Sequence, residues 1–95
     1  MEKLYKECTD FLKSENWNVR KENEIGEGGC KLCHEYWTNK EGKCINFLKV
    51  DKGEWYITMY TNWSKKIENA GKYYGRVYKF ENLMYFAYLP IENIK

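Results

Sequence analysis

The chain has 95 residues, with 16 lysines and arginines against 14 aspartates and glutamates, for a net charge of +2. A chain of this length predicts a single compact domain over residues 1–95 with a small core, which excludes a two-lobed enzyme with a cleft between domains. The charge is spread evenly along the sequence, so there is no basic arm of the kind that binds nucleic acid.

The composition is biased in a way that codon usage explains. Fourteen of the 16 basic residues are lysine, and Asn, Ile, Tyr and Phe are abundant while Ala, Arg and Pro are scarce. We therefore expect the gene to come from an AT-rich prokaryotic genome, or from one of its phages or mobile elements. The N-terminus is charged, and no apolar run approaches the roughly 20 residues of a membrane span. We expect a cytoplasmic protein, located in the host cytoplasm if phage-encoded, with no membrane partner.

The N-terminal pattern predicts a helix followed by an edge strand. Apolar side chains recur every three to four residues over 3–15, which is typical of an amphipathic helix. Around Trp17 the period changes to two, and Val19 and Ile25 share a parity opposite to that of the charged residues. We therefore predict a strand over 17–25 with one solvated face, at an edge of a sheet where it could also pair with a second copy.

Three runs rich in β-branched and aromatic residues predict an antiparallel meander. They cover 30–38, 44–50 and 54–62, and the short loops between them end in glycine. The middle run is apolar on both parities and is expected in the interior of the sheet. In the third run we expect one face to hold Trp55, Ile57, Met59 and Trp63, and the other to hold Tyr56, Thr58 and Tyr60.

The C-terminal part is predicted as a short helical turn and a hairpin. Residues 64–71 have Ser64 as a helix cap and Gly71 just past the end. Residues 73–89 are dominated by strand-forming side chains, with a turn near Glu81. A helix is the alternative for their second half, because four apolar residues have helical spacing: Phe80, Leu83, Met84 and Ala87. The predicted class is α+β, with the N-terminal helix packed on an antiparallel sheet of about five to six strands, made of the meander over 30–62 and the hairpin over 73–89.

The cysteines form a motif that could hold a cofactor. Cys30, Cys33 and His34 match C-x-x-C-H, the attachment motif of c-type haem, but the chain shows no export signal and has a single histidine. Zinc bound by Cys30, Cys33 and Cys44, with His34 or Cys8 as the fourth ligand, is the better alternative.

Strand geometry disfavours zinc. In the expected hairpin Cys44 faces Trp37, so Cys33 is four residues further along, roughly 13 Å away at about 3.3 Å per residue. We therefore predict four thiols, no disulfide and no cofactor.

The remaining residues favour a binding protein over an enzyme. His34 is a single histidine whose neighbour Cys33 points to the opposite strand face, so the pair forms no nucleophile–base dyad. Some aromatic residues can fill a core under the helix. A surplus of tyrosines surrounds Arg76, and Tyr and Arg are enriched in protein interfaces. The predicted partner-binding residues are Tyr74, Arg76 and Tyr78, which share a strand parity, with Tyr56 and Tyr60.

We therefore expect a non-enzymatic protein that inhibits or neutralises a larger host protein, such as an anti-defence inhibitor or an immunity-type protein. The alternative is a domain that binds a nucleotide or single-stranded nucleic acid by aromatic stacking and lysines. If the chain is an inhibitor or immunity-type protein, we expect its partner to be a host protein. We expect the chain itself to be a monomer or a symmetric dimer.

Overall fold

The computed structural model describes residues 2–63 and 71–90, and it has the predicted α+β architecture. Five antiparallel strands form one sheet in the order β1-β2-β3-β4-β5. The elements in chain order are α1 (Glu2–Ser14), β1 (Asn18–Ile25), the short 3-10 helix η1 (Glu27–Gly29), β2 (Lys31–Thr38), β3 (Cys44–Val50), β4 (Trp55–Thr61), β5 (Lys72–Arg76) and α2 (Phe80–Tyr88). None of the helices in this described part is long and apolar enough to cross a membrane.

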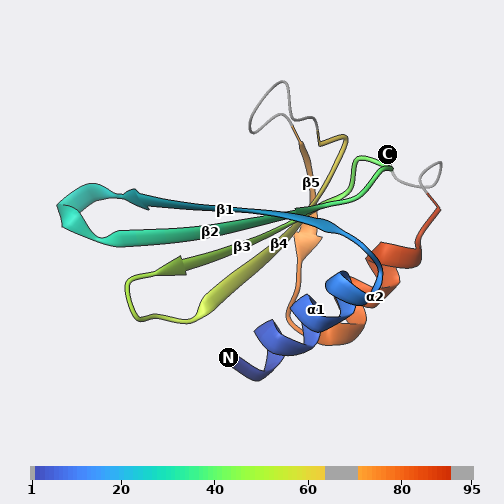
Figure 1. The fold of residues 1–95 in the computed structure, drawn as a ribbon, viewed down its shortest axis with the longest axis horizontal. Coiled ribbons are helices and arrows are strands. Elements are labelled where there is room, and N and C mark those ends of the chain that lie inside the picture. The colour runs from blue at the N-terminus through green and yellow to red at the C-terminus, as the bar shows by residue number, and fades with distance from the viewer. Residues whose placement is uncertain (1, 64–70, 91–95) are drawn as a thin grey trace.

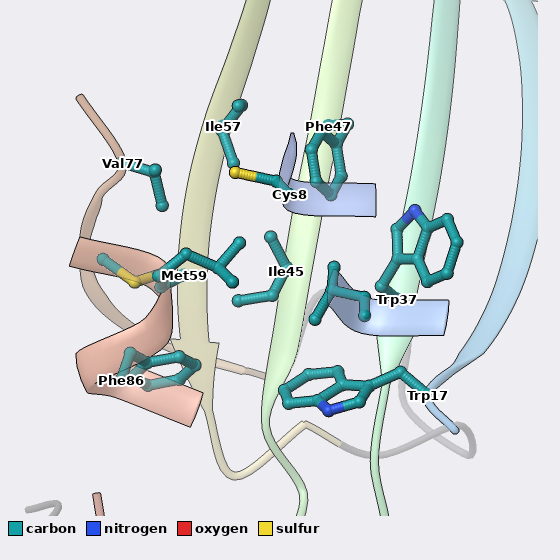
Figure 2. Packing of buried hydrophobic residues seen from close by; sticks show 11 residues of the cluster. Cys8, Trp17, Trp37, Ile45, Phe47, Ile57, Met59, Val77 and Phe86 are labelled. Atoms are coloured by element: carbon teal, nitrogen blue, oxygen red, sulfur yellow. The ribbon is translucent and has the colours of Figure 1, made fainter. Parts of the chain in front are cut away.

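The two helices lie on the same side of the sheet, near the end opposite the β1–β2 and β3–β4 turns (Figure 1). The core fills the space between the helices and that sheet face, as Figure 2 shows. Alternate strand positions supply Trp37, Ile45, Phe47, Ile57 and Met59. Burying each of these side chains contributes about 1.5–3 kcal/mol, so this face holds most of the hydrophobic stabilisation of the domain.

Helix α1 forms and ends where its sequence predicts. Its apolar stripe buries Cys8 and Leu12 against the sheet. At its C-terminus Asn16 adopts a positive φ of 62°, and the Trp17 N–H donates to the Leu12 carbonyl at 3.0 Å. This is the Schellman arrangement, which ends a helix and turns the chain. Here it turns the chain directly into β1, which is an edge strand as predicted.

The predicted hairpin over 73–89 is wrong in its second half, where the chain forms α2. The helical spacing is the stronger signal here, because it brings Leu83 and Phe86 into the core. The Asn82 side-chain oxygen accepts the backbone N–H groups of Tyr78 and Lys79 at 3.1 and 2.9 Å, which fixes the start of the helix. Strand propensity is a weak local preference that this burial overrides.

The expected position of Trp63 is also wrong. It does not continue the core face of β4 but contacts Tyr36 and Tyr60 on the opposite side of the sheet. Asn62 has a positive φ of 55°, which breaks the alternation of side chains before Trp63. The helical turn predicted over 64–71 lies, apart from Gly71, outside the described residues.

Candidate interaction face

The sheet face that neither helix covers is the candidate functional surface, and we term it the open face. It is built from the even-numbered positions of β1 to β4, together with Tyr73 and Arg76 of β5, which pair with Tyr60 and Thr58. The register therefore places Tyr56 and Tyr60 on this face, as predicted.

Both arginines of the chain lie on the open face, and each contacts tyrosine rings. The Arg20 guanidinium lies 4.9 Å from the centre of the Tyr36 ring. The Arg76 guanidinium lies 4.7 Å from the centre of the Tyr56 ring and 5.1 Å from that of Tyr78. Each such contact contributes about 0.5–1 kcal/mol at an exposed site and holds the planar group in place. By contrast, the described lysines on strands occupy positions of the opposite parity: Lys21, Lys31, Lys49 and Lys72.

A row of aromatic rings crosses the open face between the two arginines. His34 stacks on Tyr36 with ring centres 5.5 Å apart, and Tyr36 stacks on Trp63 at 5.6 Å. Trp63 contacts Tyr60 at 5.5 Å, and Tyr60 contacts Tyr73 at 6.2 Å. Burial raises the pKa of the Tyr36 and Tyr60 hydroxyls above the usual value.

This row surrounds a hollow of about 280 Å³, lined by His34, Tyr36, Asn46, Tyr60 and Trp63. The His34 Nε2 lies 2.9 Å from a carboxylate oxygen of Glu24, whereas its buried Nδ1 has no hydrogen-bond partner among the described residues. A β-carbon at Gly71 would clash with the Trp63 ring. Glycine at this position therefore lets the indole lie against the backbone at the rim of the hollow.

Of the three residues predicted to share one face, Arg76 and Tyr78 lie in contact with each other, whereas the predicted placement of Tyr74 beside them is wrong; their binding of a partner stays a prediction. A register irregularity between Met59 and Tyr60 interrupts the pairing of β4 with β5. Tyr74 contacts the Phe86 ring of α2, with centres 4.7 Å apart, and so lies on the helix side of the sheet. The three residues that do gather are Tyr56, Arg76 and Tyr78, and we term them the Arg76 clamp.

The cysteines are spread over both faces of the sheet, and all four are free thiols. The expected register is wrong by one residue, because Cys44 pairs with Thr38 and Trp37 pairs with Ile45. Cys33 is five positions from Thr38 along β2, which separates it from Cys44 by roughly 16 Å. Within the described residues, no three His, Cys, Asp or Glu side chains are grouped so that they could hold a metal ion.

Burial raises the pKa of the Cys8 and Cys44 thiols from 9.0 to about 12, because the charged thiolate is poorly solvated inside the protein. These two thiols are therefore weak nucleophiles at neutral pH.

Three residues of the open face were not among the predicted binding residues: Arg20, Tyr36 and Trp63. The chain has two arginines against fourteen lysines, and this scarcity was the available signal that Arg20, like Arg76, could have a specific role. Tyr36 and Trp63 could not be placed, because their contact joins β2 to the residue that follows the kink at Asn62. Comparison with protein-family models, with curated proteins and with solved structures finds no match for this chain.

Proposed function

We propose that this chain is a small non-enzymatic binding protein that attaches through its open face to a larger host protein and inhibits or neutralises it. The observation that carries the proposal is that both arginines lie on this face, each against tyrosine rings. An anti-defence inhibitor or immunity-type protein encoded by a phage or mobile element is the biological setting that we propose for it.

The chemistry of these residues supports binding to a protein. Tyrosine offers a large contact area with few rotatable bonds, and arginine adds planar hydrogen-bonding groups, so both are enriched among the residues that dominate interface energies. Tyr56 and Tyr78 are 48% and 67% exposed, so their rings remain accessible to a partner. The tyrosine contacts also hold the arginine side chains before binding, which reduces the entropy lost when a partner docks.

The experiment is affinity capture from the source cell, followed by measurement of the dissociation constant for the captured protein. We expect Arg20→Ala and Arg76→Ala each to weaken binding by at least tenfold. Lys52→Ala, an exposed change in the β3–β4 turn, serves as the control and should leave binding unchanged. A captured protein that binds the double arginine variant as tightly as the wild type would contradict the proposal.

The hollow beside Trp63 favours one second candidate, a site for a nucleotide or single-stranded nucleic acid. Its aromatic lining is suited to stacking with a base, worth about 1–3 kcal/mol per base. Under this alternative, nucleotides or oligothymidylate would raise the melting temperature, with an effect that falls steeply as salt increases. Under the protein-binding proposal they would leave it unchanged.

A further inference from the structure

The two arginines of the open face have similar ring contacts but different hydrogen-bond partners. Arg20 lies over Tyr36, and its Nη1 donates to Glu22 Oε1 at 2.6 Å. At Arg20, therefore, one guanidinium both contacts a tyrosine ring and donates a hydrogen bond to a carboxylate.

Arg76 has the same kind of ring support without the carboxylate. Tyr56 and Tyr78 lie 4.7 and 5.1 Å from its guanidinium carbon. Over residues 2–63 and 71–90, no carboxylate lies within ion-pair distance of Arg76. Among the described residues the Arg76 guanidinium donates no side-chain hydrogen bond, so its N–H groups are the donors left for a ligand.

We propose that the Arg76 clamp binds a side-chain carboxylate from an acidic segment of the partner protein, an inference that rests on the proposed function. A carboxylate is planar and accepts two parallel hydrogen bonds from a guanidinium, which a single lysine ammonium cannot reproduce. The partner therefore takes the place at Arg76 that Glu22 takes at Arg20.

The surroundings of the clamp favour a carboxylate over the phosphates of a nucleic acid. Phosphate backbones are bound by several cations in a row, because each neutralised phosphate releases counterions. The clamp has one cation between two neutral rings, and the described strand lysines point to the other side of the sheet. This arrangement suits one directed ion pair with an acidic side chain.

The test is a titration of the ¹⁵N-labelled protein, followed through the arginine Nε–Hε signals. The probes are the capped acidic peptide acetyl-Asp-Glu-Asp-amide, the neutral peptide acetyl-Asn-Gln-Asn-amide, inorganic phosphate and oligothymidylate. We expect the acidic peptide to shift the Arg76 signal in a saturable way, the neutral peptide to have no effect, and phosphate and oligothymidylate to bind at least tenfold more weakly. The Arg20 signal is the internal control and should move less, because Glu22 already occupies its edge.

Two variants link the clamp to the partner. Arg76→Lys keeps the charge but loses the forked donors, and should weaken binding of both the acidic peptide and the captured partner by at least tenfold. Lys52→Arg, which adds a guanidinium outside the open face, should change neither. The circular dichroism spectrum of each variant confirms that it remains folded.

The inference and the proposed function fail in different ways. If phosphate or oligothymidylate shifts Arg76 more strongly than the acidic peptide does, or if Arg76 and Arg20 respond equally, the carboxylate assignment is wrong. If Arg76→Lys binds the captured partner normally while other changes on the open face abolish binding, the inference fails and the proposed function stands. If the partner does not use the open face at all, the proposed function fails.

Discussion

Lys43 is a fully buried lysine that connects the β2–β3 loop to the end of α2. Its ammonium donates to the carbonyl oxygens of Ala87 and Leu89 at 3.1 and 2.5 Å, and lies 3.4 Å from a carboxylate oxygen of Glu41. The last carbonyls of a helix have no intrahelical partner and carry partial negative charge, so a cation there is stabilising. Lys43 thereby holds in place the helix that forms where the sequence predicted the second half of a hairpin.

Replacing Lys43 with methionine should lower the free energy of unfolding by about 1–3 kcal/mol. Methionine keeps most of the buried volume but leaves the two carbonyls without a donor. Urea denaturation measures the change, and Lys52→Met, in an exposed turn, is the matched control and should stay within about 0.5 kcal/mol of the wild type. Equal stability of Lys43→Met and wild type would show that solvent satisfies these carbonyls instead.

At the scale of elements, β5 directs one side chain toward the helices and another onto the open face. The irregularity opposite Met59 and Tyr60 turns Tyr74 toward α2, whereas Arg76 stays on the open face. Bulges commonly redirect a side chain in this way, and strand parity alone cannot reveal them. Two tyrosines that flank Arg76 in sequence therefore have different expected roles.

Tyr74→Ala should lower the free energy of unfolding by about 1–2 kcal/mol, because it removes the ring that packs on Phe86. It should leave partner binding unchanged. Tyr78→Ala should weaken partner binding. Its free energy of unfolding should stay within about 0.5 kcal/mol of the wild type, because the Tyr78 ring is 67% exposed. Denaturation and binding measurements on both variants check this separation, and a stability loss confined to Tyr78→Ala would contradict the placement of the two rings.

At the scale of the whole molecule, one thiol is buried on each side of β3. Cys8 lies in the core between α1 and the sheet, and Cys44 lies on the parity of the open face. Both have a pKa raised to about 12 by burial, whereas Cys30 and Cys33 are only partly buried. The native fold therefore protects two thiols and leaves two accessible.

The free energy of unfolding should be insensitive to these thiols below pH 9 and should fall as the pH rises from 9 toward 12. Above pH 9 the unfolded chain releases these protons first, which favours unfolding by up to about 1.4 kcal/mol per pH unit for each thiol. Urea denaturation under reducing conditions from pH 8 to 10.5 measures this slope. Cys44→Ala should have a shallower slope than the wild type, and identical slopes would show that Cys44 titrates normally in the folded state.

Local patterns in the sequence determined α1, the three strands of the meander and the positions of the loops between them, but not the register of β2 against β3, which was wrong by one residue. Each of these depends on residues close together in the chain: the helical stripe of α1, the period of two, and loops that end in glycine. The placement of Tyr56 and Tyr60 on one sheet face could also be predicted, because both lie at alternate positions of the regular strand β4.

The tertiary structure alone decided the rest. Whether residues 80–88 form a strand or a helix depended on the core under α1, which accepts Leu83 and Phe86. The positions of Tyr74 and Trp63 depended on an irregular pairing and on one positive φ angle. The sequence contains two arginines. Only the pairing of the five strands places both of them on the sheet face that the helices leave uncovered. Such relations join residues far apart in the chain, and their energies come from burial and pairing that no local pattern contains.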